Sequence, residues 1–399
     1  MPAARDRCSR VVAIEPLTRG QWLATSNQPL ATPDLEMARK LESDKILFGA
    51  VVVLVLFGAL MVFSASAVMA AERYGHSYYF LLRQGVWAAL GLVAMVVVMS
   101  VNYRYLRSAA LVFPALALQL ILLVAVLFAD RSHHAHRWFH AGPINFQPSE
   151  LSKIVLVIFL AYFLDLRKGS VNHFQHTLLP IILVAGASLA LVLKEPDLGT
   201  TLAIALVVVA MLFVAGLRWY FFAGAVLAAI PALYLLIFRV PYRRARFLTF
   251  LDPYKDPLGR GFQILQSYIA VGTGGISGVG LMEGKQKLFY LPEPQTDFIF
   301  AVISEELGLL GALAVLALFG VILWRGLRAA AGCSSNFGRL LAIGITVTLV
   351  GQALVNISVV VGLLPTKGIP LPFVSYGGSS LLMNLLAVGV LLNVSQHAD

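Results

Sequence analysis

One carboxylate in the sequence stands where a long polar segment gives way to an apolar run. Asp297 lies in the stretch Tyr290–Phe300, which reads YLPEPQTDFIF. A carboxylate at such a boundary loses part of its hydration, which raises its pKa and makes it a better proton acceptor. The alternative is a structural role, in which Thr296 or Asp297 caps the following helix. The spacing alone therefore leaves a general base and a helix cap as alternatives.

A second group of ionisable residues lies in the stretch that reads RWFHAGPINFQPSELSK, from Arg137 to Lys153. Glu150 and Lys153 are three residues apart at the start of an apolar run, so a helix would place them on one face. Ionisable groups at membrane depth are costly and usually have a function and a partner. The alternatives are a mutually neutralising structural pair and, for Arg137 and Trp138, anchoring at the membrane interface.

Two further charged segments complete the set of candidates. Lys194 to Asp197 reads KEPD between two apolar runs, where proline and acidic residues also suit the start of a helix. Arg243 and Arg246 lie beside Tyr242 in a later polar segment. Cations next to a membrane suit a phosphate-bearing headgroup, although attraction to ordinary anionic lipid is the alternative.

Other suggestive patterns do not predict a site. The segment Gly278–Lys285 has the wrong glycine spacing for a phosphate-binding loop, and Gln286 stands where Ser or Thr is needed. The spacing of the histidines at 133, 134, 136 and 140 matches no standard metal site. Cys8 and Cys333 both fall on the predicted cytoplasmic side, so no disulfide is expected.

The composition shows what must position these residues. The chain has 399 residues, 59% of them hydrophobic and 13% charged, whereas soluble domains have about 25% charged residues. Such a chain must expose its surface to lipid, and apolar runs of about 20 residues recur along it. The net charge of +10 is explained by cytoplasmic loops rather than by nucleic acid, which we do not expect as a partner. The predicted class is an all-α, polytopic integral membrane protein.

About ten spanning helices are expected. The candidate spans run approximately from 46–68, 79–99, 108–128, 150–164, 177–193, 199–216, 219–238, 298–323, 338–361 and 375–394. Lys and Arg are more frequent in one set of short connections, which places both termini in the cytoplasm. Residues 1–45 are predicted to be a largely disordered cytoplasmic tail, and residues 46–395 the membrane domain.

The connection between the seventh and eighth spans, about 239–297, is a large, basic, extracytoplasmic loop. Long loops are exempt from the charge bias, but a loop this long is usually functional. Within it, Phe262, Leu265 and Ile269 have helical spacing and predict a helix on the bilayer surface. The four charged segments all lie on the outer side in this topology.

Several of these segments together resemble one known family. The segments are YLPEPQTDFIF, DPLGRGFQILQSYIAVGTGG from Asp256, RWF and FQPSELSK, KEPDLGT, and GIPLPFVSYGGSSLL from Gly368. They are similar, in the same order, to the SEDS family of shape, elongation, division and sporulation proteins, over about residues 45–395. The segments QKLFYLPE and GLLPTKG resemble division members more than elongation members.

The resemblance implies a peptidoglycan glycosyltransferase that polymerises lipid II onto a nascent glycan strand. It also implies a class B penicillin-binding protein and other division proteins as partners, at the septum of the cell membrane. The family's essential aspartate corresponds to Asp297, its RW motif to Arg137 and Trp138, and its PSE-and-lysine motif to Pro148–Glu150 and Lys153.

The chemistry of such a transfer requires a base on the acceptor hydroxyl and cations for the leaving diphosphate. We assign the base to Asp297. Substrate binding is assigned to the remaining candidates, Arg137, Trp138, Glu150, Lys153, Lys194, Asp197, Arg243 and Arg246. Mg²⁺ or Mn²⁺ would assist by neutralising diphosphate, but the sequence offers no protein cage for one. A lipid II flippase and a non-catalytic division scaffold remain as alternatives.

Overall fold

The computed structural model describes residues 43–129, 137–141, 144–366 and 368–398. The chain divides into two units, residues 1–41 and 42–399. The first unit lies outside the described residues. Of the predicted disordered tail, 1–45, only residues 43–45 are described. Cys8 and the histidines at 133, 134 and 136 also lie outside the described residues.

All ten predicted apolar segments are helices. They are α1 (Lys45–Tyr74), α2 (Tyr79–Ser100), α3 (Ala109–Val126), α4 (Pro148–Leu166), α5 (Leu179–Lys194), α6 (Leu198–Val214), α7 (Trp219–Phe238), α10 (Ile299–Gly332), α11 (Asn336–Val360) and α12 (Gly378–Gln396). Among the described residues, eight helices are long and apolar enough to cross a membrane, where α5 is counted together with the turn before it as Phe174–Lys194. The remaining two of the ten predicted spans are α6 and α4. Helix α6 is only 17 residues long, and α4 carries the Glu150–Lys153 ion pair in its first turns. The predicted polytopic all-α class is confirmed.

Shorter elements connect the spans. They are η1 (Tyr103–Arg107), β1 (Phe139–Ala141), β2 (Ile144–Phe146), η2 (Phe174–Leu178), α8 (Pro241–Leu251), η3 (Pro253–Lys255) and α9 (Phe262–Gly274). The antiparallel β1–β2 hairpin and helix α8 were not expected from the sequence. The helix predicted near Phe262 is α9, but it packs on α10 and α11. Its Ile264, Ser267 and Ala270 are buried, so only part of it can face the bilayer surface.

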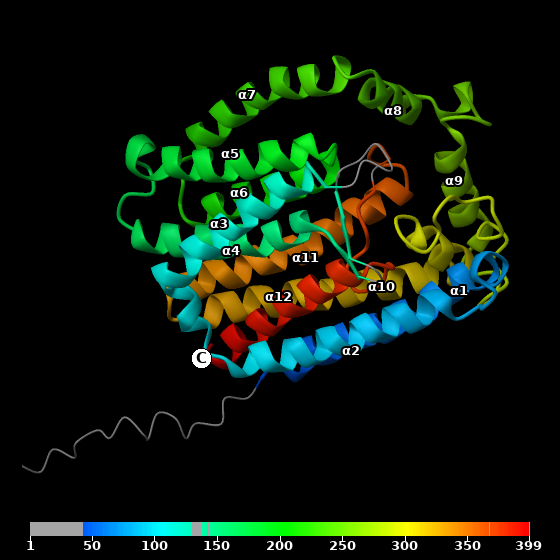
Figure 1. Ribbon diagram of the computed structural model, residues 1–399, viewed down its shortest axis with the longest axis horizontal. Coiled ribbons are helices and arrows are strands. Elements are labelled where there is room, and N and C mark those ends of the chain that lie inside the picture. The colour runs from blue at the N-terminus through cyan, green and yellow to red at the C-terminus, as the bar shows by residue number, and fades with distance from the viewer. Residues whose placement is uncertain (1–42, 130–136, 142–143, 367, 399) are drawn as a thin grey trace, which may run out of the picture. The chain divides into compact units, whose positions relative to one another are not determined.

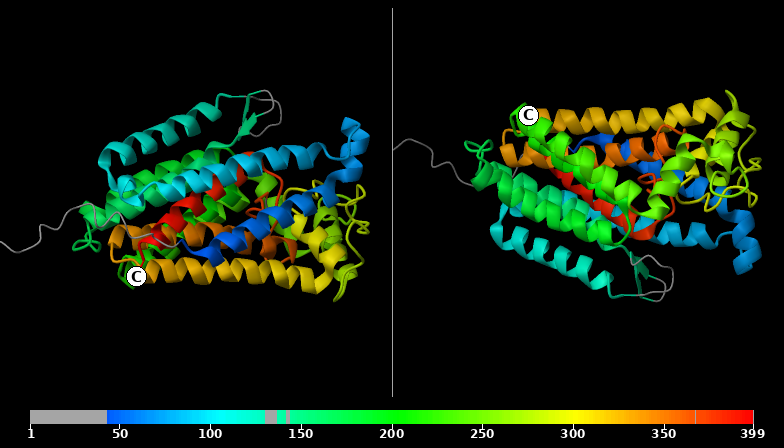
Figure 2. Two further views of the ribbon diagram at one scale, coloured as in Figure 1. Left: turned by 90° about the horizontal axis from the view of Figure 1, so that it is seen from below. Right: turned by 90° about the horizontal axis from the view of Figure 1, so that it is seen from above.

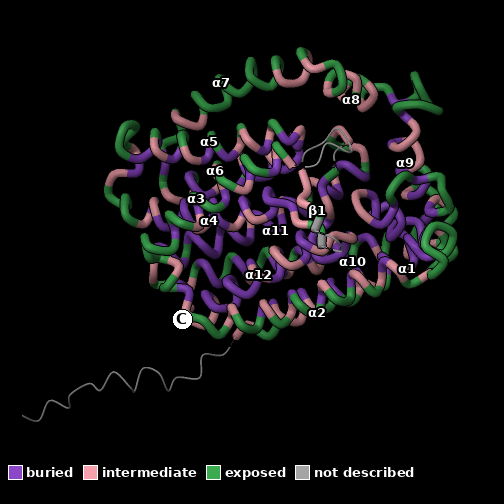
Figure 3. The backbone as a smooth tube through the Cα atoms, viewed as in Figure 1, coloured by how far each residue is buried: buried purple, intermediate pink, exposed green. Residues whose placement is uncertain are grey.

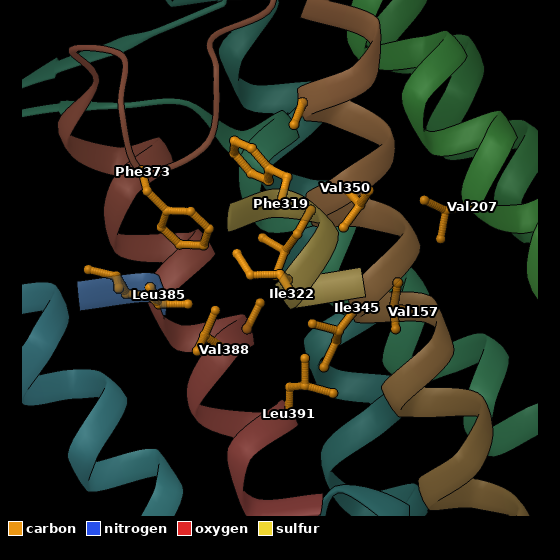
Figure 4. Close-up of a cluster of buried hydrophobic side chains, with 14 of the residues drawn as sticks. Val157, Val207, Phe319, Ile322, Ile345, Val350, Phe373, Leu385, Val388 and Leu391 are labelled. Atoms are coloured by element: carbon orange, nitrogen blue, oxygen red, sulfur yellow. The ribbon is translucent and has the colours of Figure 1, made fainter. Parts of the chain in front are cut away.

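The core lies where α10, α11 and α12 meet (Figures 1 and 2). Phe319, Ile345, Phe373 and Leu385 converge there from three helices and a loop (Figure 4). In contrast, α7 contains no buried residue and arcs away from the other helices (Figures 1 and 3). A helix that is apolar all round and unburied by protein must be solvated by lipid.

Helix α10 is broken inside its apolar span. Gly308 has φ 65° and ψ −160°, a conformation that glycine adopts without steric cost. The break frees backbone groups that must be satisfied within the membrane domain. The N–H of Leu309 donates to the carbonyl of Gly275 at 2.9 Å, and the N–H of Val279 donates to the carbonyl of Glu305 at 3.0 Å. The large loop is therefore hydrogen-bonded into the broken helix.

A buried ion pair reinforces this junction. The ammonium of Lys287 lies 2.7 Å from Glu306 Oε1 and 3.1 Å from the hydroxyl of Ser64 on α1. The neighbouring carboxylate of Glu305 accepts hydrogen bonds from the N–H groups of Lys285 and Gln286. Lys287 therefore connects the loop to α1 as well as to α10.

The opposite end of the bundle gathers the connections that were predicted to be cytoplasmic. Asp44 caps α1 and pairs with Arg325 of α10 at 2.6 Å. The hydroxyl of Tyr103 in η1 contacts the thiol of Cys333. The backbone of Cys333 pairs with that of Ala398, near the C-terminus, in an isolated antiparallel β-bridge. The start of the membrane domain and its last described residues therefore lie at one end, as an even number of spans requires.

Helix α1 provides a test of how tightly the loop that follows α11 is packed. A Cβ at Gly58 would lie 2.5 Å from the carbonyl oxygen of Phe373, whereas a Cβ at Gly49 on the same helix meets nothing within 4 Å. Because the clash at Gly58 is with backbone, Gly58→Ala should lower the free energy of unfolding by about 1–3 kcal/mol. Gly49→Ala should not. Equal thermal unfolding temperatures for both purified variants would contradict this packing.

Candidate functional site

A cavity of about 270 Å³ opens at the end of the bundle where the predicted outward connections meet. Its wall is built by the segment before β1, the α5–α6 turn, helix α8, the start of α10 and the loop after α11. Five residues predicted from sequence line it, namely Arg137, Asp197, Arg243, Arg246 and Asp297. Segments separated by up to 231 positions in the sequence, from Arg137 to Gly368, therefore form one polar site.

The backbone of Asp297 is held from α11. Asn356, which is buried, donates its amide N–H groups to the carbonyl of Asp297 at 2.9 Å and to the carbonyl of Ile369 at 2.7 Å. A Cβ at Gly368 would lie 2.8 Å from Asp297 Oδ2. Glycine therefore lets the second loop pass directly beside the carboxylate.

The side chain of Asp297 does not cap α10. The N-cap residue is Phe298, no side chain caps it, and Thr296 bonds the carbonyl of Glu293 instead. Within the described residues no hydrogen bond to the Asp297 carboxylate is recorded, and the group lines the cavity. The capping alternative is thus not observed.

The surroundings of Asp297 favour its protonated form. Burial raises its pKa to about 6, with further raising by the charges of Asp197 and Glu293, and opposed by Arg137 and Arg246. Desolvation therefore exceeds the attraction of the arginines. The carboxylate remains mostly ionised at neutral pH but is far more basic than an exposed aspartate.

The α5–α6 turn is fixed by Arg137 and Asp197. The guanidinium of Arg137 donates to the carbonyls of Glu195 at 2.9 Å and Pro196 at 2.6 Å. The carboxylate of Asp197 is the N-cap of α6, accepting from the N–H of Thr200 at 3.0 Å and from its hydroxyl at 2.8 Å. The helix-start interpretation of this turn is confirmed, and the same two side chains also line the cavity.

Glu195 lies fully buried in the same turn. Desolvation, together with the charge of Asp197, raises its pKa to about 8 against the opposing effect of Arg137. Its side chain is therefore neutral at pH 7. A protonated Glu195 adds no negative charge beside the cavity. The three arginines there are therefore opposed only by Asp197 and Asp297 among the lining residues.

Two of the three arginines of α8 line the cavity, and they do so in different ways. Arg243 makes long hydrogen bonds of 3.4 Å to the carbonyls of Leu193 and Leu236. Arg246 stacks over the ring of Tyr242, with its guanidinium carbon 4.7 Å from the ring centroid. Both residues line the cavity, and their backbone or ring contacts use only part of each guanidinium.

Four predicted substrate-binding residues do not line the cavity. Lys194 is exposed and Trp138 is half-buried outside it. Lys153 is buried, 2.9 Å from Glu150 and hydrogen-bonded to Gln352. The geometry matches the mutually neutralising pair that the sequence left open, and substrate contact by these residues stays a prediction.

The Lys153–Glu150 pair is connected through Gln352 to the loop beside Asp297. Gln352, its partner on α11, donates at 2.8 Å to the carbonyl of Pro370, in the loop that Asn356 ties to Asp297. Sequence reasoning missed Gln352, Asn356 and Gly368. The signal that was available is two amides four residues apart on one face of an otherwise apolar helix.

The fold and the cavity define a polytopic membrane protein with an acidic group and a cluster of arginines at one end of its bundle. The model of the FtsW/RodA/SpoVE family, described as cell cycle proteins, matches residues 44–399. The chain belongs to this family.

Curated relatives agree with this assignment. The chain is 48% identical over 354 residues to a probable peptidoglycan glycosyltransferase FtsW of Geobacter metallireducens, covering 88% of this chain and 94% of the relative. It is 41% identical over 361 residues to the stage V sporulation protein E of Bacillus subtilis, covering 90% and 99%.

Solved structures share the fold. One concerns the coordination of polymerization and crosslinking by a peptidoglycan synthase complex, with a TM-score of 0.74, 33% identity, and coverage of 89% of this chain and 98% of that one. The crystal structure of the rod shape determining protein RodA of Thermus thermophilus has a TM-score of 0.67, 29% identity, and coverage of 89% and 97%.

The role of Lys153 can be tested through stability. Lys153→Met leaves the buried charge of Glu150 unpaired, which should cost roughly 3–5 kcal/mol. The double variant Glu150→Gln/Lys153→Met removes both charges and should recover most of the loss. Thermal unfolding in detergent measures both, with Lys194→Met as the exposed lysine control. A single variant that keeps full stability but loses activity would instead place this ammonium on substrate.

Proposed function

We propose that this chain is a peptidoglycan glycosyltransferase that polymerises lipid II into glycan strands, releasing undecaprenyl diphosphate. One observation carries the proposal. A carboxylate of raised pKa, Asp297, lines a cavity together with three arginines, Arg137, Arg243 and Arg246. The curated relative named as a peptidoglycan glycosyltransferase covers most of the chain.

The reaction follows from these groups. Asp297 accepts the proton of the acceptor sugar's 4-hydroxyl, whose oxygen attacks the anomeric carbon of the donor. The bond from that carbon to the diphosphate oxygen breaks, and the electron pair leaves with the diphosphate. One displacement inverts the configuration at the anomeric carbon. A base with a pKa near the working pH is effective because it is both ionised and strongly proton-accepting.

Arg246 stabilises the charge that develops on the leaving diphosphate. Guanidinium groups suit this task because they stay ionised and present parallel N–H donors to phosphate oxygens. Arg137 and Arg243, which are already oriented by backbone carbonyls, hold the sugars beside Asp297, and this prior orientation reduces the reorganisation needed when substrate binds. Asp197 shapes the turn that carries this wall.

A divalent ion remains an open prediction. Among the described residues no group of three or more His, Cys, Asp or Glu side chains could hold a metal, and the Asp197 carboxylate is committed to Thr200. The protein donors therefore do not fit a resident Mg²⁺ or Mn²⁺. We derive no step through such an ion.

The multi-pass membrane chain carries its site at the end opposite its described terminal residues. We propose that this end is extracytoplasmic, that both termini are cytoplasmic, and that the protein acts at the division septum. The partners would be a class B penicillin-binding protein and other division proteins. Support for the first of these partners comes from the similarity to the synthase complex that coordinates polymerization and crosslinking.

A flippase and a scaffold are less well supported. A flippase needs a polar path that reaches both membrane faces, whereas all residues recorded as lining the Asp297 cavity come from one end of the described bundle. A scaffold gives no reason for a carboxylate of raised pKa among three arginines. Gel analysis of products separates the three, because only a polymerase lengthens glycan.

Replacing the proposed base tests the mechanism directly. Asp297→Asn keeps the shape of the side chain but cannot accept a proton, so the initial rate of glycan formation from labelled lipid II should fall roughly 10²–10⁴-fold. The assay uses purified protein with its penicillin-binding partner. Arg244→Gln, which changes an exposed arginine that does not line the cavity, is the control. Parental rates with Asp297→Asn would exclude this residue as the base.

The pKa of Asp297 predicts a pH dependence. The base is active when ionised, so kcat/KM should be constant above the pKa and fall as pH decreases through about 6. Well below that pH the fall should approach tenfold per pH unit. Thermal unfolding at each pH shows whether the protein stays folded. A flat profile between pH 5 and 8 in folded protein would contradict the assignment.

A further inference from the structure

A second cavity, of about 440 Å³, adjoins the one that contains Asp297. Tyr242, Arg246, Gln263 and Thr366 line both cavities, so the stacked Tyr242–Arg246 pair stands between them. The second cavity extends to the start of α9, where Arg260 completes its wall. Its residues are not among those predicted from sequence, apart from Arg246.

The charges of the second cavity are all positive. Arg246 and Arg260 line it, and none of its described lining residues carries a carboxylate. Asp256 lies behind this wall, where its carboxylate accepts from the backbone N–H of Arg260 at 3.0 Å, and Glu293 accepts from the amide of Gln295 at 2.9 Å. In contrast, the first cavity contains Asp197 and Asp297. A polyanion is therefore stabilised more in the second cavity.

The arginines also differ in what they already bind. Arg137 donates to two backbone carbonyls, and Arg243 donates to two others. For the guanidiniums of Arg246 and Arg260 no hydrogen bond is recorded within the described part of the chain; Arg246 has only its ring contact. Five N–H donors on each are thus available to an anion.

We infer that the second cavity is the binding site for the diphosphate of the polyprenyl-linked donor, with Arg260 as a binding residue and Arg246 between diphosphate and sugar. This rests on the proposed function. In a single displacement the leaving oxygen lies opposite the attacking oxygen, so diphosphate and base must lie on opposite sides of the anomeric carbon. Asp297 lines only the first cavity, and Arg260 lines only the second.

Neutral donors complete the site. Thr249, Gln263 and Thr366 supply hydroxyl and amide groups around the two arginines. Such groups suit the remaining oxygens of a diphosphate and the hydroxyls of the attached sugar. The first cavity is then left for the acceptor sugar, whose hydroxyl must reach Asp297.

Arg260 can be tested without disturbing the base. Arg260→Gln should raise KM for lipid II about tenfold, with kcat changed less than about threefold, because it removes a charge-assisted contact made before and during the reaction. Arg244→Gln is the matched control, since Arg244 is exposed on α8 and lines neither cavity. Equal KM values for the two variants would overturn the inference.

A binding measurement separates this inference from the proposed function. Parent and variants in nanodiscs are titrated with farnesyl diphosphate, farnesyl monophosphate and farnesol. We expect the diphosphate to bind tightest and Arg260→Gln, but not Arg244→Gln, to weaken it about tenfold. Arg260-dependent diphosphate binding in a protein that makes no glycan would support the site and overturn the proposed function. Equal binding of diphosphate and monophosphate, or binding that is unaffected by Arg260→Gln, would overturn the site.

Discussion

The candidate site depends on one buried amide. Asn356 of α11 donates to the carbonyl of Asp297 and to the carbonyl of Ile369, and so joins the end of the large loop to the loop after α11. Neither segment has regular structure at this point, and each would otherwise leave a backbone oxygen unpaired near the apolar bundle. The position of the Asp297 carboxylate relative to the arginines follows from this contact.

The remaining supports use the same physical rule, that a polar group taken into the bundle needs a partner. Gln352 connects the Lys153–Glu150 pair to Pro370, while Lys287 and Glu306 connect the large loop to the break in α10. These pairs are neutralised and hydrogen-bonded. Asp297 and Glu195 differ from these pairs, because desolvation outweighs the nearby arginines and raises the pKa of each, and of the two only Asp297 lines the cavity. A carboxylate with a raised pKa that lines a cavity is suited to accept a proton from a substrate.

Much of this architecture could be predicted from the sequence because a membrane imposes simple requirements. Each apolar run became a helix, and the boundaries of α2 and α7 agree with the predicted ones to within a residue. The charge bias of short loops placed Arg137, Asp197 and Asp297 on one side. The break at Gly308 could not be predicted in the same way, because its freed backbone groups are satisfied by a loop about 30 positions away in sequence.

The sequence by itself determined which residues are candidates for chemistry and which end of the bundle carries them, because hydrophobicity and charge act through local composition. Only the tertiary structure decided which candidates meet. It placed Arg243 and Arg246 with Asp297, and left Lys194 exposed and Lys153 paired below the cavity. It also revealed the contacts of Asn356 and Gly368 with Asp297 and the position of Arg260 in the wall of the second cavity, because these depend on segments that are distant in the sequence.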